Sequence, residues 1–329
     1  MKSNVSVAKR RLPVLAALIG GFLRGLVSAA CAANPAVAAA GAAFDVDEVR
    51  PGVFVHQGRH VGLDHPDRDD IANTGFILGE ECVAVVDPGG SVANGLALRE
   101  AIRNRTSLPV CYVFLTHVHF DHVLGASAFV RPGDPDPPVV VGHQRLVAGI
   151  EGNRHFFAEN FGAELGDDPA LARVVAPTET VSGEARFDLG GRQLIARAHG
   201  VAHTDADLSV YDSATGTLFT GDLVFRERIP VLDGSLLGWF DALAVLAGQR
   251  PEYVVPGHGT PVAGFDAAVA DLERYLTVLR DETRAAVAAG RYIEEAKDSV
   301  AASERARWLL FSENHRRNVS RAFRELEWE

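Results

Sequence analysis

Short apolar runs alternate with longer segments of mixed polarity along the chain from Phe44 onward. Runs rich in β-branched and aromatic residues predict buried strands, and they occur at 53–57, 74–78, 82–86, 110–115, 139–141, 186–189, 194–198, 208–211, 218–220 and 253–255. Helices are predicted at 94–104, 144–163, 236–246, from Phe265 onward and from Ser303 to about Leu326. Because this alternation occurs in two successive halves, we expect an α/β fold with two mixed sheets and helices outside them.

The first 43 residues differ from the rest in charge and in amino-acid composition. They contain five basic residues and no acidic one, whereas the whole chain has 32 basic and 43 acidic residues and a net charge of −11. A basic stretch ending at Arg11, the apolar run Leu12–Leu23 and the Ala-rich tract 29–43 are typical of an export signal. The run is too short to span a bilayer. We therefore expect a cleaved Sec or Tat signal and a periplasmic mature protein without a stable membrane span, with a lipid-modified Cys31 or an uncleaved tail as alternatives.

The composition of the remaining chain excludes some classes of function. Without residues 1–43 it has 27 basic and 43 acidic residues, a net charge of −16, which argues against nucleic acid as a partner. The hydrophobic fraction of 47% is typical of a folded globular protein. Three cysteines are too few for a disulfide scaffold. Cys82 and Cys111 lie in neighbouring predicted strands, where they would form either a disulfide or two buried thiols.

The segment Thr116–His122 carries the strongest chemical signal. It follows the predicted strand Val110–Leu115 and contains three histidines and one aspartate, His117, His119, His122 and Asp121. Alternating residues at a strand end can point the same way into a cleft. Imidazole and carboxylate are the ligands that a borderline cation such as zinc prefers. The segment therefore predicts a metal site.

This His-x-His-x-Asp-His pattern resembles the signature of the metallo-β-lactamase superfamily. The other motifs of that family follow in order, namely Asp87 at the end of a strand, His203 before a threonine, Asp222 after a glycine and His258 in Pro-Gly-His-Gly. The resemblance covers residues 44–264. It implies an αββα sandwich of two mixed β-sheets flanked by helices as the catalytic domain, with residues 265–329 as a helical extension packed on it.

The resemblance also assigns metal ligands residue by residue. The first metal would be held by His117, His119 and His203, and the second by Asp121, His122 and His258, with Asp222 between them. It implies two Zn²⁺ ions, with iron and manganese as alternatives, and Asp121 as the catalytic residue that orients the attacking water and accepts its proton. Asp87 would hold the histidine-rich segment from behind, and His199 is the alternative to His203.

Two further features narrow the expected activity. The carboxylate Asp222 argues against a true β-lactamase and favours glyoxalase-II-like or lactonase-like hydrolases, while His119 argues against the diiron redox branch. The runs 224–239 and 318–329 are similar to SoxH-related quinoprotein relay system zinc metallohydrolases, which are exported and linked to pyrroloquinoline-quinone (PQQ)-dependent dehydrogenases. We expect hydrolysis of an ester, thioester, lactone or similar bond in a small molecule. A weak β-lactamase and a non-catalytic metal-binding maturation factor for a quinoprotein system are the alternatives.

Three residues are candidates for binding the substrate. Arg228 and Trp239 follow the ligand Asp222 closely, so their run is expected to line the cleft. Arg228 would bind a substrate carboxylate, and Trp239 would form a wall against an apolar group. His60 lies beside a polar loop that would border the cleft. The alternatives are an ion pair for Arg228 and a core position for Trp239.

Overall fold

The computed structural model describes residues 44–329, and the predicted export signal at 1–43 lies outside the described residues. Within 44–329, none of the helices combines the length and the apolar character needed to cross a membrane.

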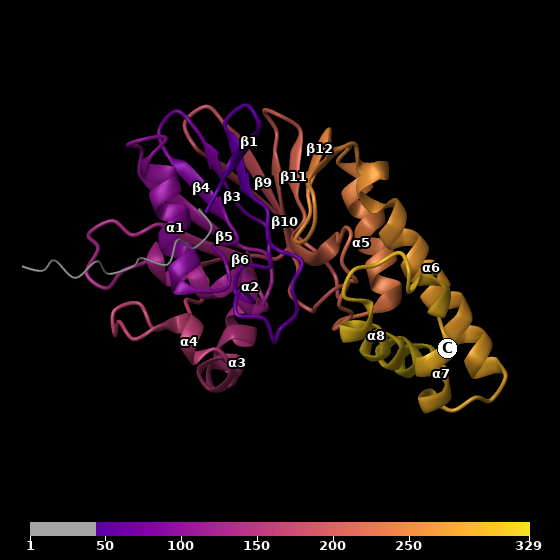
Figure 1. The fold of residues 1–329 in the computed structure, drawn as a ribbon. Helices are drawn as coiled ribbons and strands as arrows, with labels where there is room; N and C mark the ends of the chain where they lie inside the picture. The colour runs from indigo at the N-terminus through magenta and orange to yellow at the C-terminus, as the bar shows by residue number, and fades with distance from the viewer. Residues whose placement is uncertain (1–43) are drawn as a thin grey trace, which may run out of the picture. The chain divides into compact units, whose positions relative to one another are not determined.

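A seven-stranded sheet forms the first layer, with its strands in chain order (Figure 1). The strands are β1 (Asp47–Arg50), β2 (Val53–His56), β3 (Thr74–Leu78), β4 (Val83–Val86), β5 (Val110–Leu115), β6 (Val139–His143) and β7 (Glu179–Val181). The pairs from β1 to β4 are antiparallel, and those from β4 to β7 are parallel. The strands predicted at 74–78 and 110–115 are confirmed, because short apolar runs with β-branched and aromatic residues mark buried strands well.

A second sheet of six strands has the order β13-β12-β11-β10-β9-β8. Its strands are β8 (Glu184–Asp188), β9 (Gln193–Ala198), β10 (Leu208–Asp212), β11 (Thr217–Phe219), β12 (Tyr253–Val255) and β13 (Val262–Ala263). The pair β11–β12 is parallel, and the other pairs are antiparallel. Apolar side chains of both sheets, among them Phe114, Phe187 and Phe219, form a shared core between them.

Helices cover the outer faces of both sheets. The first sheet carries α1 (Val92–Arg103), α2 (Phe120–Val123), α3 (Leu146–Asn160) and α4 (Gly162–Leu165), and the second carries α5 (Leu236–Gly248) and α6 (Phe265–Ala288) (Figure 1). The helix α8 (Phe311–Leu326) packs on α6, and α7 (Ile293–Ser299) packs on α8. Each outer interface has its own apolar core. The αββα sandwich predicted from the sequence is therefore confirmed.

The predicted helix at 303–326 begins later than expected. Only a short 3₁₀ turn at Ala302–Glu304 precedes α8, which starts at Phe311 after Leu310 adopts a left-handed φ of 58°. The intervening segment buries Trp308, whose indole donates a hydrogen bond to Glu304. Glu304 also pairs with Arg274 of α6. These tertiary contacts override the helical propensity of the segment.

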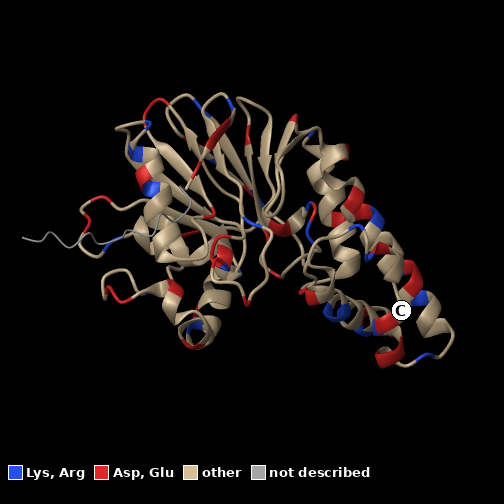
Figure 2. Cartoon of the chain, viewed as in Figure 1, with Lys and Arg blue, Asp and Glu red and all other residues tan. Residues whose placement is uncertain are grey.

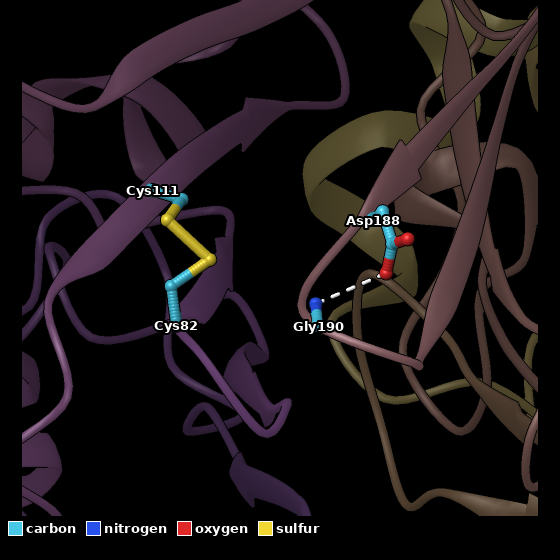
Figure 3. The surroundings of a disulfide bond; sticks show 4 residues. All are labelled: Cys82, Cys111, Asp188 and Gly190. Atoms are coloured by element: carbon cyan, nitrogen blue, oxygen red, sulfur yellow. Dashed lines mark hydrogen bonds between the residues drawn. A yellow bond between two sulfur atoms is a disulfide. The ribbon is translucent and has the colours of Figure 1, made fainter.

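A disulfide joins Cys82 and Cys111, whose Cα atoms lie 5.8 Å apart (Figure 3). Cys82 precedes β4 and Cys111 lies early in β5, so the bond ties two parallel neighbours near their starts. Of the two outcomes left open by the sequence, the structure has the disulfide. Beside it, the amide of Cys82 donates a hydrogen bond to Leu189, in the turn between β8 and β9. The bridge therefore lies where the two sheets meet.

Candidate metal centre

The predicted ligands lie on loops and short helical turns that follow strands of both sheets. β5 ends at Leu115, and the histidine-rich segment follows it and enters α2 at Phe120. His203 lies between β9 and β10, Asp222 in the 3₁₀ turn Gly221–Leu223 after β11, and His258 after β12. Because these connections lie at the same edge of the sandwich, residues up to 141 positions apart come together.

The first ligand group consists of His117, His119, His203 and Asp222. Nδ1 of His119 lies 3.1 Å from Nε2 of His117 and 3.1 Å from Nε2 of His203. Asp222 Oδ2 completes the group at 3.6 Å from His117 Nε2 and 3.4 Å from His203 Nε2.

The second ligand group consists of Asp121, His122 and His258. Nε2 of His258 lies 3.3 Å from Asp121 Oδ2, and Nε2 of His122 lies 3.5 Å from the same oxygen. Asp222 also reaches this group, with Oδ2 3.3 Å from His258 and Oδ1 3.1 Å from His122. One carboxylate therefore lies between the two groups, as a bridging ligand would.

The donor atoms fit cations. A tetrahedral Zn²⁺ with ligands at 2.0–2.1 Å would separate its donors by about 3.3 Å, and the separations above lie on both sides of that value. In the described part of the chain, His122 Nε2 and Asp222 Oδ1 are buried and, although they lie 3.1 Å apart, neither has a partner with hydrogen-bond geometry. Burial lowers the pKa of His203 to about 4 and that of His117 well below its usual value, which favours the neutral, metal-binding imidazoles. Two metal sites are consistent with these residues.

The second ring nitrogen of each of these histidines is held by a neighbour, as is usual for metal ligands. Nδ1 of His203 donates to the Val231 carbonyl and Nδ1 of His258 to the Ile71 carbonyl, each at 2.7 Å. The ring of His119 has the opposite orientation, and its Nε2 lies 3.0 Å from Asp233 Oδ2. Sequence reasoning missed Asp233, because a single aspartate in the run after Asp222 has no diagnostic spacing.

Asp87 lies behind the histidine-rich segment. Its carboxylate accepts hydrogen bonds from the amide and the hydroxyl of Thr116, at 2.9 and 2.7 Å, and from Nδ1 of His122 at 2.8 Å. Asp87 adopts a left-handed φ of 51°, an uncommon conformation outside glycine. These contacts fix the ring of His122 with Nε2 toward Asp121 and Asp222.

The absence of a side chain at Gly257 leaves room for the ligand Asp222. A Cβ on Gly257 would lie 2.0 Å from Asp222 Oδ1, so this position requires glycine.

His199, the alternative to His203, bonds Ser209 Oγ at 2.8 Å and belongs to neither ligand group.

A cavity of about 420 Å³ opens onto both ligand groups, including His119, Asp121, Asp222 and His258. Its walls are largely apolar and come from α2, α3, α8 and loops, with Leu63, Val118, Phe120, Phe156, Phe157 and Phe161 among them. Arg228 lines this cavity although only 4% of its surface is exposed. Within residues 44–329 it forms no ion pair, and its Nε and Nη1 have no hydrogen-bond partner. Burial lowers its pKa.

The other two candidates for substrate binding lie elsewhere. Trp239 is fully buried, donates its indole N–H to the Leu223 carbonyl and packs against the ring of His203. It supports a metal ligand from behind, so its prediction as a cleft wall is corrected. The cause is its position on α5, whose buried face points into the core. His60 pairs with Glu227 at 2.9 Å and is not part of the cavity wall, although Leu63 of the neighbouring loop lines it.

Comparisons with known proteins agree with this geometry. A bovine (Bos taurus) protein, acyl-coenzyme A thioesterase MBLAC2, is 27% identical over 191 residues, which cover 51% of this chain and 61% of that protein. A probable metallo-hydrolase of Streptococcus pyogenes serotype M6 is 25% identical over 197 residues, covering 57% and 78%.

Solved structures share the fold. A β-lactamase domain protein from Burkholderia ambifaria has a TM-score of 0.64 at 21% identity, covering 89% of this chain and 90% of its own. The sec-alkylsulfatase Pisa1 from Pseudomonas sp. has a TM-score of 0.62 at 19% identity, covering 86% and 50%.

The family profile described as the metallo-beta-lactamase superfamily matches residues 67–258, more than half of the chain. The matched range contains both ligand groups and ends at the ligand His258. The chain therefore belongs to the metallo-β-lactamase superfamily and is a metal-dependent hydrolase with a binuclear His/Asp site.

Proposed function

We propose that the chain is a periplasmic hydrolase for an ester, thioester or lactone bond in a small molecule that carries an apolar group and an acidic group. The observation that carries this proposal is the cavity, which combines both ligand groups, aromatic walls and the buried cation Arg228. Such a substrate would place its apolar part against the walls and its anion at Arg228, with the scissile bond beside the metal ligands.

The residues around the bond have separable tasks. Two divalent cations held by the two groups would supply Lewis-acid chemistry and a water of lowered pKa. Asp121 lines the cavity, where its carboxylate can orient the attacking water and accept its proton. The phenylalanine walls lower the polarity around the bond, which strengthens the electrostatic interactions there.

Arg228 supports the acidic group of the substrate. A buried charge without a partner is costly, and such charges persist where a ligand completes them. The carboxylates of Asp121, Asp222 and Glu313 act on Arg228 through space but lie beyond ion-pair distance. Cations bound by Asp121 and Asp222 would offset the charge of these two residues, which leaves the guanidinium available to a bidentate carboxylate or a similar anion.

Three observations favour an ester or thioester over a β-lactam. The bridging position is a carboxylate, Asp222, and the bovine relative is named as a thioesterase. The aromatic walls match an acyl or aryl group. A lactone or a β-lactam remains a second type of substrate for the same site, and a test panel separates them.

The cellular setting is also part of the proposal. The disulfide between Cys82 and Cys111 supports an oxidising compartment such as the periplasm, in agreement with the export pattern of residues 1–43. The similarity of runs 224–239 and 318–329 to SoxH-related metallohydrolases supports a functional link to a PQQ-dependent dehydrogenase system. A non-catalytic maturation factor for such a system is the alternative.

The decisive experiment is a panel of 4-nitrophenyl esters and acyl thioesters in matched pairs, neutral or carrying a carboxylate. We expect Arg228→Gln to lower kcat/KM for the acidic member roughly 10–100-fold, the value of a charge-assisted hydrogen bond, and to change the neutral member little. Arg131→Gln, in an exposed loop, is the matched control. An equal loss of kcat/KM for the acidic and the neutral member would refute the anion site, but it would not contradict the proposed hydrolase activity. Failure of the fully metal-loaded protein to turn over ester, thioester, lactone or β-lactam substrates would favour the maturation factor.

A further inference from the structure

We propose that the C-terminal helix α8 is part of the metal centre, because Arg317 of α8 holds Asp233 and Asp233 holds the ligand His119. Asp233 and Arg317 are positioning residues in this arrangement. The inference goes beyond the proposed function, since it concerns how the site is built and not which bond is cleaved.

His119 needs an external partner more than the other ligand histidines. Its Nδ1 faces His117 and His203, so the metal-binding atom is Nδ1 and the proton must be on Nε2. The side chain of His119 is 26% exposed, whereas those of the four other ligand histidines are at most 4% exposed. This ring is therefore packed less tightly than the others, and the hydrogen bond to Asp233 sets both its tautomer and its direction.

Asp233 is itself held from the other side. Its Oδ2 accepts the hydrogen bond from His119 Nε2 at 3.0 Å, and its Oδ1 pairs with the guanidinium of Arg317. Arg317 comes from a different part of the chain, 84 residues away. It also lines the cavity, so the pair borders the space in which a substrate would bind.

The same face of α8 holds the loop that carries Asp233. Buried Asn318 donates to the Pro230 carbonyl and accepts from the amide of Leu232, at 2.7 and 2.9 Å. One turn further, Arg321 donates to the Gly234 carbonyl at 2.8 Å. Residues 317, 318 and 321 recur with helical spacing, so one face of α8 makes these contacts. Figure 2 shows basic residues along this helix.

This loop also supports a second ligand. The amides of Asp233 and Gly234 donate to the carbonyl of His203, and His203 Nδ1 donates to the carbonyl of Val231. A displacement of α8 would therefore reach two histidines of the first ligand group. The helical extension thus acts on the metal centre through named hydrogen bonds and not only through the apolar core it shares with α5 and α6.

A purely structural role makes a different prediction. Arg317 is 60% exposed, and an ion pair at such a site contributes little to stability. If the pair only supported the fold, its loss would leave metal affinity unchanged. If it positions His119, metal affinity falls while the fold keeps its stability.

The test uses the full chain and the metal alone. Variants Arg317→Gln, Asp233→Ala and the double variant are loaded with Zn²⁺, and the two dissociation constants are measured by competition with a chelator. Arg316→Gln is the matched control, because Arg316 is a neighbouring exposed arginine of α8 that pairs with Asp298 instead. The Co²⁺ electronic spectrum reports the geometry of the ligands, and thermal unfolding of the metal-free protein reports the fold.

We expect Asp233→Ala to lower the affinity for one of the two Zn²⁺ ions 10–100-fold. Arg317→Gln should lower the affinity for the same ion several-fold, and both variants should have an altered Co²⁺ spectrum. The double variant should be no weaker than Asp233→Ala, because both residues act on one ring. Equal affinities in Arg317→Gln and Arg316→Gln, or additive losses in the double variant, would overturn the proposal. Since Arg317 is exposed, its variant remains informative even if Asp233→Ala fails to fold. These measurements need no turnover, so they fail or succeed independently of the proposed substrate.

Discussion

Replacing Arg228 by methionine is expected to stabilise the metal-loaded protein and to impair its action on acidic substrates. The substitution keeps an unbranched side chain of similar length and removes a charge that is 4% exposed and has no ion-pair partner within residues 44–329. The backbone contacts of this position join it to the segment before α8 and do not depend on the side chain. The change therefore isolates the cost of burying the guanidinium.

The magnitude follows from the cost of an uncompensated buried charge. That cost reaches several kcal/mol per ion, and apolar replacement of buried ionic groups has stabilised proteins by about 1–4 kcal/mol. Water that reaches the cavity recovers part of it, so we expect a gain of about 1–3 kcal/mol in the free energy of unfolding. For a chain of this length that gain raises Tm by roughly 2–6 °C. The gain should be smaller in the metal-free protein, where Asp121 and Asp222 offset the charge of Arg228.

Thermal and urea unfolding of the metal-loaded proteins, with Arg131→Met as the exposed control, measure this difference. The control should change the free energy of unfolding by less than about 0.5 kcal/mol. A stabilised variant with lower kcat/KM for acidic esters would place Arg228 among residues kept for function at a cost in stability. Destabilisation by 1 kcal/mol or more would refute the reasoning, because it would mean that the guanidinium has a favourable partner in the native protein.

Elemental analysis should find two transition-metal ions per chain, and His119→Ala should lower this number and abolish hydrolysis of any ester that the native protein cleaves; retention of both ions and full activity would contradict the ligand assignment. Gly257→Ala should weaken metal binding at least 10-fold in a chelator competition, because its Cβ would lie 2.0 Å from Asp222 Oδ1, and unchanged affinity would show that the loop moves freely. The hydrogen bonds to Asp70 and to a backbone carbonyl raise the pKa of His56 against the opposing effect of burial. His56 should therefore stabilise the fold fully below pH 6.5, its unfolded value, and lose this contribution as the pH rises through the raised folded value, so the difference in unfolding free energy between the native protein and His56→Gln should shrink across that range. A difference independent of pH would contradict this assignment.

Much of the fold and of the ligand set could be predicted from the sequence, because both depend on local patterns. The strand Val110–Leu115 and the histidines after it are contiguous, so periodicity and residue type were sufficient. Trp239 shows the limit of such patterns. An aromatic residue on a helix near a ligand can face a cleft or the core, and only the packing of α5 against Leu223 and His203 decides.

The contacts that complete the site are long-range, and no local pattern marks them. Asp233 and Arg317 are 84 residues apart, and each is an ordinary charged residue in its own segment. The late start of α8 has the same origin, since the partners of Glu304 and Trp308 lie on α6. A sequence motif specifies which atoms can bind a metal, whereas the surroundings that orient those atoms are specified by tertiary structure.

The charged residues of the metal centre act together on a substrate in the cavity. Two buried carboxylates, Asp121 and Asp222, are adjacent to the ligand histidines and near the buried Arg228. Bound cations would reverse the local charge, so Arg228 and the cations together would attract an anion into a cavity that also has apolar walls. Asp233 also lines this cavity, and its ion pair with Arg317 offsets a negative charge that would otherwise repel the anion. The acidic character of the chain as a whole therefore does not argue against an acidic substrate, because the local field at the loaded site has the opposite sign.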